Sequence, residues 1–338
     1  MKSAEHFDYI DFARILGLYL MIVGHMNFLS ASSSAVIFAF HMPLFFIISG
    51  MFHKPKPFAV MLTKVYKTLL LPFLIIALSW CIIYLFFLIR KNMVDVDYIF
   101  HVLGTFLSIG ESTSIFSSYC IYIWFLLALV EIKLMTTLFS GKRKLFLLAI
   151  CSIILFVFFE NFEITRIYLG GVLSIDSALL ALPFYVIGFL IKDYVLTPTD
   201  SFRISKKSFV IVLSCMLLTL FLSRTNGIVD IHHCKYGDNL LLFYVTGVLG
   251  SLFIIELARI KCQYIPNGKI TQTIVSGATI IIGYSAWTTG LIKPIFLVLC
   301  NNNLGGLIIA VIVLAVLYPI ILIASKYFPP ILGKRNIR

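Results

Sequence analysis

The sequence predicts an all-α polytopic membrane protein with about ten transmembrane helices and with both termini in the cytoplasm. Three observations indicate this fold class. Of the 338 residues, 60% are hydrophobic and only 12% are charged, which is about half the charged fraction of ordinary soluble domains. The mean hydropathy of +1.02 is too high for a chain that must hide its apolar surface from water. Basic residues, finally, gather in alternate segments between the apolar runs.

Apolar runs of spanning length follow one another along the whole chain. A membrane helix needs about 20 such residues, so the run at 97–110 is too short and is expected to lie at the interface or to re-enter. Because no soluble region interrupts the runs, we expect one membrane domain over residues 1–338. The ten predicted spans are 10–29, 35–52, 68–90, 118–139, 145–160, 174–192, 208–223, 239–258, 272–292 and 304–324.

The basic residues predict the orientation. With a cytoplasmic N-terminus, 19 of the 27 Lys and Arg residues fall in inner segments and 6 in outer loops, as the positive-inside rule requires. The net charge of +12 then belongs to cytoplasmic loops beside membrane lipid, and no nucleic-acid partner is expected. The seven cysteines show no CxxC pair and no metal-ligand spacing, so we expect neither a metal nor a bound cofactor.

The first span carries polar residues in phase, in the stretch "RILGLYLMIVGH" that runs from Arg14 to His25. Eleven residues at 100° each come within about 20° of three full turns, so Arg14 and His25 share one helix face about 16 Å apart. Asp11 lies on that face and can pair with Arg14. Such a stripe must face a protein interior or a wet cavity. A snorkelling Arg14 and an interfacial His25 are the plainer alternatives.

The second span places another titratable group at membrane depth. His41 lies in "FHMPLFFIISGMF", two residues before Pro43, which is expected to kink the helix and to free a carbonyl. His41 is therefore either a second proton-accepting group or a histidine bonded to the kink carbonyl.

Charged residues also mark the third and fourth spans. Lys64 and Lys67, three residues apart, precede the third span. They are either ordinary positive-inside charges or groups that grip phosphates arriving from the cytoplasm. Glu131 and Lys133 lie within the fourth span, but residues two apart on a helix do not face each other. At least one of them needs another partner.

These motifs resemble the integral-membrane acyltransferase-3 family. The resemblance is carried by "DFARILGLYLMIVGH", with ten residues between Arg14 and His25, followed by "FHMPLFFIISGMF". The stretches "WFLLAL", "IDSALLALPFYVIGFLIK" and "YGDNLLLFYVTGVLGSL" are similar to the fucose 4-O-acetylase-like branch, in the order found there. The resemblance therefore covers nearly the whole chain.

The resemblance implies an O-acyltransferase of the bacterial plasma (inner) membrane. Such an enzyme moves an acyl group, commonly acetyl from cytoplasmic acetyl-CoA, to a sugar hydroxyl of a surface polysaccharide or lipid-linked glycan. It implies His25 as the catalytic histidine, Arg14 as its motif partner, and acyl-CoA binding by Arg14 with the basic pair Lys64 and Lys67. The family pair is usually two arginines. A late histidine of the related branch is missing, and Tyr284 stands in the corresponding stretch "SGATIIIGYSAW".

The remaining polar groups Asp11, His41 and Glu131 are candidates for supporting this site. The alternative reading is a secondary transporter of a small anionic solute or glycan, which would also line a cavity with charges. A transporter is expected to show internal repeats and broken helices. The sequence shows prolines within spans but no repeat.

Overall fold

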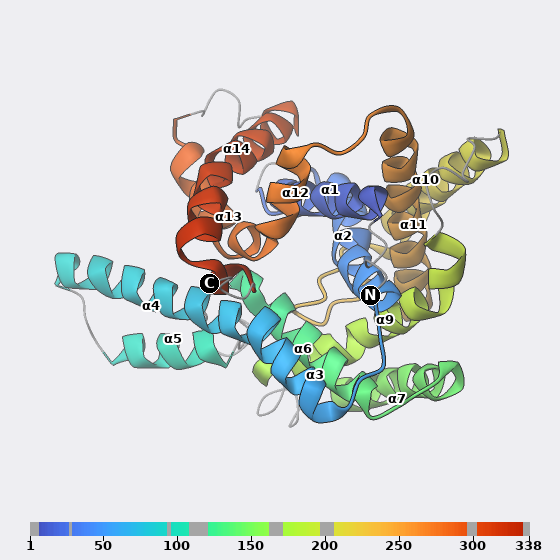
Figure 1. Cartoon of the computed structure of the whole chain (residues 1–338), viewed down its shortest axis with the longest axis horizontal. Helices are drawn as coiled ribbons and strands as arrows, with labels where there is room; N and C mark the ends of the chain where they lie inside the picture. Colours follow the sequence, from blue (N-terminus) through green and yellow to red (C-terminus); the bar gives the residue numbers. More distant parts are fainter. Residues whose placement is uncertain are drawn as a thin grey trace. The chain divides into compact units, whose positions relative to one another are not determined.

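The computed structural model describes seven stretches of the chain, and within them it is helical without a β-strand (Figure 1). This confirms the all-α fold class. The described residues are 7–26, 29–92, 96–107, 121–161, 172–196, 206–295 and 303–333. The α-helices are α1 (Asp8–Gly24), α2 (Ala31–Met51), α3 (Phe58–Val65), α4 (Leu71–Lys91), α5 (Asp97–Phe106), α6 (Trp124–Thr137), α7 (Lys142–Asn161), α9 (Ile175–Val195), α10 (Lys206–Asn226), α11 (Leu240–Tyr264), α12 (Lys269–Ser276), α13 (Ala278–Ile292) and α14 (Asn303–Tyr327). Shorter turns are η1 (Tyr66–Leu70), η2 (Ile121–Ile123), η3 (Val172–Ser174) and η6 (Pro329–Leu332).

Seven helical segments of the described chain are long and apolar enough to span a membrane, or eight if a bent pair of helices counts as one span. The bent pair is α12 with α13, which meet at 80°. The predicted spans 10–29 and 118–139 form α1 and α6, with 17 and 14 residues, which is short for a bilayer crossing. The count of ten and the orientation of the termini stay predictions. The seven segments are 31–51, 58–91, 142–161, 172–195, 209–226, 240–264 and 305–327.

The exposed surface of these helices is too apolar for a protein surrounded by water. Large hydrophobic side chains are exposed along α4, α7, α10 and α14. Phe86 is 57% exposed, Phe221 66% and Ile323 60%. A soluble protein rarely shows contiguous apolar faces, whereas lipid tails cover them without penalty. The chain is therefore a multi-pass membrane protein.

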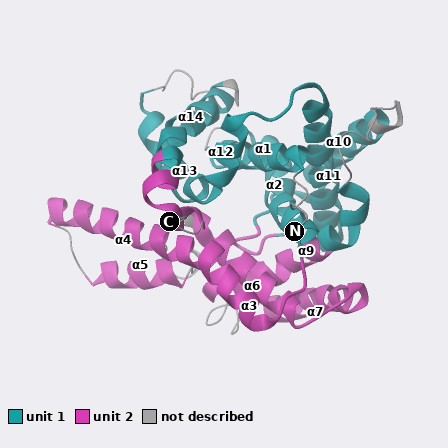
Figure 2. Ribbon diagram, viewed as in Figure 1, with its two compact units in different colours: residues 1–53, 187–230, 236–322 teal, residues 54–186, 231–235, 323–338 magenta. Residues whose placement is uncertain are grey.

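The chain divides into two compact units, which are described separately below (Figure 2). Unit 1 comprises residues 1–53, 187–230 and 236–322. Unit 2 comprises residues 54–186, 231–235 and 323–338. The prediction of a single domain over the whole chain is not tested by this division.

Unit 1 is organised around α2, which packs against α1, α10 and α11. Two glycines allow the closest approaches. A Cβ on Gly188 of α9 would lie 2.0 Å from the carbonyl oxygen of Ile47, and one on Gly250 of α11 would lie 2.5 Å from Phe40. Small residues let membrane helices pack backbone to backbone. α2 is therefore packed among α1, α9, α10 and α11, and His41 in its middle is buried.

Unit 2 contains a π-helical turn just before a proline in the predicted third span. Its helical segment runs from Phe58 through the π-turn η1 into α4, which begins with Pro72 at its first turn. Proline has no N–H for the carbonyl four residues earlier and its ring clashes with it. That carbonyl belongs to Thr68, inside η1, and a π-turn is a common way to absorb such a break. Nearby, Met61, Val65 and Val130 form a buried cluster that joins α3 to α6.

Candidate active site

The predicted pair at the start of α1 is present in unit 1. Arg14 Nη1 donates to Asp11 Oδ1 at 2.8 Å, and the guanidinium also lies over the ring of Phe52, 5.4 Å from its centroid. The Asp11 side chain is nearly buried and that of Arg14 is one-third exposed. The pair leaves the remaining guanidinium N–H groups to donate elsewhere, which suits recognition of an anionic group.

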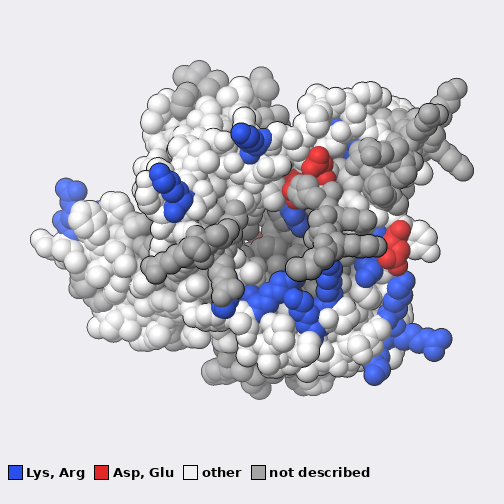
Figure 3. Space-filling model, in the orientation of Figure 1, with Lys and Arg blue, Asp and Glu red and all other residues white. Residues whose placement is uncertain are grey.

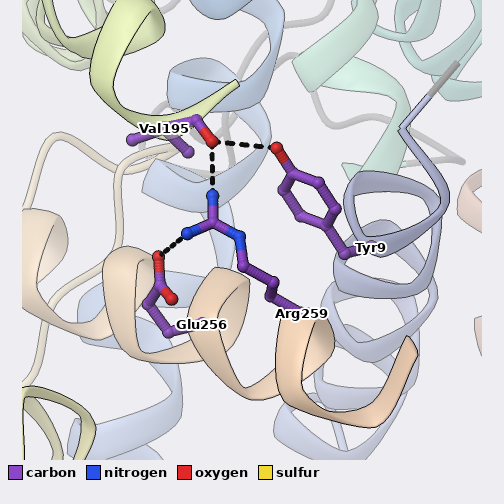
Figure 4. A network of polar contacts seen from close by, with 4 residues as sticks. All are labelled: Tyr9, Val195, Glu256 and Arg259. Carbon is purple, nitrogen blue, oxygen red and sulfur yellow. Dashed lines mark hydrogen bonds and ion pairs between the residues drawn. The ribbon is translucent and has the colours of Figure 1, made fainter. Parts of the chain in front are cut away.

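A buried arginine, Arg259, anchors the same end of α1 (Figure 4). Arg259 of α11 donates to Glu256 at 2.7 Å and also to the carbonyl of Val195, at the end of α9. The Tyr9 hydroxyl donates to the same carbonyl at 2.8 Å, and the Arg259 guanidinium lies 4.6 Å from the Tyr9 ring centroid. Sequence reasoning missed this network. Its only signal was an acid and a base three residues apart at the end of an apolar run.

Polar contacts from the segment after α11 hold the first turns of α1 as well. Asn267 Nδ2 donates to the carbonyl of Asp8 at 2.6 Å, and Lys261 Nζ donates to Asn267 Oδ1 at 3.0 Å. The Lys261 ammonium also lies 4.2 Å from the ring centroid of Phe12. The first turns of α1 are thus fixed by contacts with α9, with α11 and with the segment after α11.

His25 and His41 are each fixed by a backbone carbonyl one turn earlier. His25 follows the last residue of α1, and its Nδ1 lies 2.8 Å from the carbonyl oxygen of Met21. His41 Nδ1 lies 2.9 Å from the carbonyl oxygen of Ile37. A carbonyl can only accept, so Nδ1 carries the proton in each neutral ring and Nε2 carries the lone pair. Ile37 is not the carbonyl that Pro43 would free, since that belongs to Ala39.

The two imidazoles form one cluster, which the sequence did not predict. Their ring centroids are 6.1 Å apart in an edge-on arrangement, and Phe38 lies 5.3 Å from His25 and 5.0 Å from His41. His41 is 1% exposed, whereas His25 is only partly buried. The negative charge of Asp230, from the loop between α10 and α11, acts on both rings. Nothing in the spacing of the sequence relates Asp230 to either histidine.

Lys64 and Lys67 belong to unit 2, in α3 and in the π-turn η1. The positive charges of Lys56 and Lys54 act on Lys64, so this segment is a concentration of like charge. Figure 3 shows that basic side chains are more abundant than acidic ones on the face in view. Such a segment is stabilised when an anion binds to it.

Glu131 also lies in unit 2, on α6. Its Oε2 atom is buried and has no hydrogen-bond partner among the described residues, and the charge of Asp176 acts on it. Lys133 lies over the ring of Tyr185, 5.4 Å from its centroid. Glu131 and Lys133 therefore point to different neighbours, as the helix spacing predicts.

The comparison with protein families assigns the chain to a class of enzyme. The model of the acyltransferase-3 family, described as an acyltransferase domain, matches residues 7–326. The chain belongs to the acyltransferase-3 family. The match begins at α1, ends in α14 and includes residues of both units, so this membrane acyltransferase must bind an acyl donor and an acceptor. No curated protein and no solved structure matches the chain. Membership of the fucose 4-O-acetylase-like branch stays a prediction.

Proposed function

We propose that this acyltransferase moves acetyl from cytoplasmic acetyl-CoA to a sugar hydroxyl of a surface polysaccharide or lipid-linked glycan in the bacterial inner membrane. The observation that carries the proposal is the placement of His25. Its tautomer is fixed by Met21, and it directly follows the helix that carries the Arg14–Asp11 pair, about three turns away. The His25 imidazole suits proton transfer, and the Arg14–Asp11 pair suits the binding of an anionic donor.

The chemical step needs one base and returns its proton. Nε2 of His25 takes the proton of the acceptor hydroxyl while the hydroxyl oxygen attacks the thioester carbonyl of acetyl-CoA. The carbon–sulfur bond then breaks, and the CoA thiolate takes the proton back from Nε2. The products are the O-acetyl sugar and free CoA thiol, and His25 ends neutral. Because Nδ1 is committed to Met21, the ring presents its lone pair only through Nε2.

The donor carries phosphates, which need cations. Arg14 supplies a guanidinium whose orientation is set by Asp11, and the segment of Lys64 and Lys67 supplies a high positive charge. Ammonium groups bind phosphate as point charges, without the two-pronged geometry of a guanidinium. We expect Arg14 to set the orientation of the donor and the lysines to set its local concentration.

Transfer and transport make different products, which gives the test. The full-length protein in lipid nanodiscs is incubated with acetyl-labelled acetyl-CoA and a panel of bacterial glycans. Label in a glycan, abolished by His25→Ala, supports the proposal. Absence of label in every glycan, together with uptake of a labelled solute by the same protein in vesicles, would establish the transporter alternative instead.

A further inference from the structure

The C-terminal end of the described chain is docked on the π-turn η1, within unit 2. The short helix η6 packs against α4 and against η1, and its last residue, Leu332, is buried. Gly333 follows with φ +65°, and a Cβ on Gly333 would lie 2.5 Å from the carbonyl oxygen of Thr68 and 3.0 Å from its Cα. Glycine is the residue that combines this left-handed backbone with so close an approach.

Thr68 connects this docking contact to the basic segment. It directly follows Lys67 in η1, and its Oγ1 donates to the carbonyl of Lys64 at 3.0 Å. Both lysine side chains are exposed. Gly333 therefore lies against the residue that adjoins one lysine and is hydrogen-bonded to the backbone of the other.

The π-turn determines which way Lys64 faces relative to α4. A π-turn takes in about one residue more than an α-helical turn, and each residue of an α-helix advances by about 100°. A helix that lost the π-turn would rotate Lys64 by about that angle relative to α4. Pro72 demands a break here, because it has no N–H for the Thr68 carbonyl, but it does not by itself select a π-turn. The contact of Gly333 with Thr68 supports the turn that is observed.

The docking segment lies beyond the part of the chain that the acyltransferase-3 model matches. The match ends at residue 326, whereas η6 comprises Pro329–Leu332. An ammonium is a point charge on a flexible stem, and a binding group that is held in place beforehand loses less freedom when its ligand arrives. A segment that recognises phosphate through lysines therefore gains from a supported backbone.

We infer that η6 and Gly333 form a positioning element for donor binding, which holds the π-turn so that Lys64 and Lys67 face the phosphates of the acyl donor. The inference rests on the proposed function, because it takes these lysines as phosphate-binding groups. Gly333 acts through Thr68 and not on the donor itself. The plainer role, in which η6 only covers the apolar surface of α4, would affect stability alone.

Protection of the lysines from chemical modification tests this positioning without any acceptor. Full-length protein in detergent is treated with N-succinimidyl propionate at increasing concentrations of CoA, and mass spectrometry measures the modification of Lys64 and Lys67. CoA that contacts these lysines protects them, which gives a half-protecting concentration. Gly333→Ala forces a Cβ against Thr68. It should raise the half-protecting concentration about 3- to 10-fold, as expected when charge-assisted contacts are weakened.

Gly141→Ala is the matched control. Gly141 also belongs to unit 2 and has φ +94°, but a Cβ there would meet nothing within 4 Å. This substitution strains the backbone as Gly333→Ala does, without pressing on a neighbour. Both variants should melt below the wild-type protein, and only Gly333→Ala should shift the half-protecting concentration. If Gly333→Ala does not fold, Leu332→Ala loosens η6 without backbone strain and should give the same shift.

Acetyl transfer separates this inference from the proposed function. Gly333→Ala should raise the KM for acetyl-CoA about 3- to 10-fold and leave kcat within about twofold. An unchanged half-protecting concentration in folded Gly333→Ala overturns the inference, whereas transfer that is lost in His25→Ala would still support the proposed function. A shifted concentration in a protein that labels no glycan would support the inference and refute the proposed transfer. Absence of CoA protection in the wild-type protein overturns the inference. If neither Gly333→Ala nor Leu332→Ala folds, η6 serves the fold and the inference is wrong.

Discussion

Replacing His25 with glutamine separates the proposed proton-accepting role of this residue from its place in the structure. A glutamine amide can still donate to the Met21 carbonyl, as Nδ1 of His25 does, but it cannot take a proton near neutral pH. General-base help is worth about 10²–10⁴ in rate, or about 3–5 kcal/mol of transition-state stabilisation. Transfer by His25→Gln should therefore fall at least about a hundredfold.

The Arg14 end of α1, where we propose that the donor binds, should be unaffected by the same change. Arg14 lies about 16 Å from His25 along the helix and has its own partner in Asp11. Sites this far apart without shared partners act nearly independently. The KM for acetyl-CoA of the remaining activity should then change less than about twofold. Transfer of labelled acetyl at varied acetyl-CoA concentrations measures both constants.

His41→Gln is the matched control. His41 is 1% exposed and packs against Phe38 and His25, so its loss disturbs a buried contact and should lower the free energy of unfolding by about 1–3 kcal/mol. Thermal unfolding in detergent measures this loss, and transfer per folded molecule should stay within about tenfold. Near wild-type transfer by folded His25→Gln would refute the assignment. Abolished transfer in stable His41→Gln would move the base to His41.

Three other predictions concern stability, donor binding and topology. Arg259→Met should lower the free energy of unfolding by about 3–5 kcal/mol, because it leaves Glu256 without its ion pair. A second substitution, Glu256→Gln, should restore part of the lost stability. A wild-type melting temperature for Arg259→Met would contradict the prediction. Lys64→Ala with Lys67→Ala should raise the KM for acetyl-CoA more than it lowers kcat, with a smaller effect at high salt; an unchanged KM would leave both as ordinary positive-inside charges. A reporter fused after Lys207 should give a cytoplasmic signal, and a periplasmic signal there would contradict the ten-helix topology.

Local spacing predicted the parts of the site that depend on one helix. The pairing of Asp11 with Arg14 follows from three residues of spacing, and the separation of Glu131 from Lys133 follows from two. Both relations involve residues within one turn of a helix, so the helical repeat alone determines them. The all-α class followed equally directly from composition, because in lipid a helix satisfies its backbone hydrogen bonds within a single segment.

Contacts between distant segments were beyond such reasoning. Asn226 closes the loop between α10 and α11 through bonds to Tyr236 and Asn239, and no periodicity encodes that closure. The same holds for Arg259, which bonds to a carbonyl 64 residues away. Helix lengths were also misjudged in places. The sequence predicts a third span at 68–90, but the helix continues back to Phe58, because the π-turn accommodates Pro72.

The chain departs from the family pattern in two places, the lysine pair and the absent late histidine, and the surroundings of each position help to explain the difference. The lysines at 64 and 67 replace a pair that is usually arginine, yet the charges of Lys54 and Lys56 act on the same segment. Under the proposed function, the number of positive charges in this segment offsets the two-pronged geometry that lysine lacks for binding phosphate, and Arg14 keeps that geometry within unit 1. The absent late histidine leaves Tyr284 on α13. Under the proposed function His25 is the base, with its Nδ1 bonded to Met21 and with His41 beside it, so proton transfer would not require a third histidine.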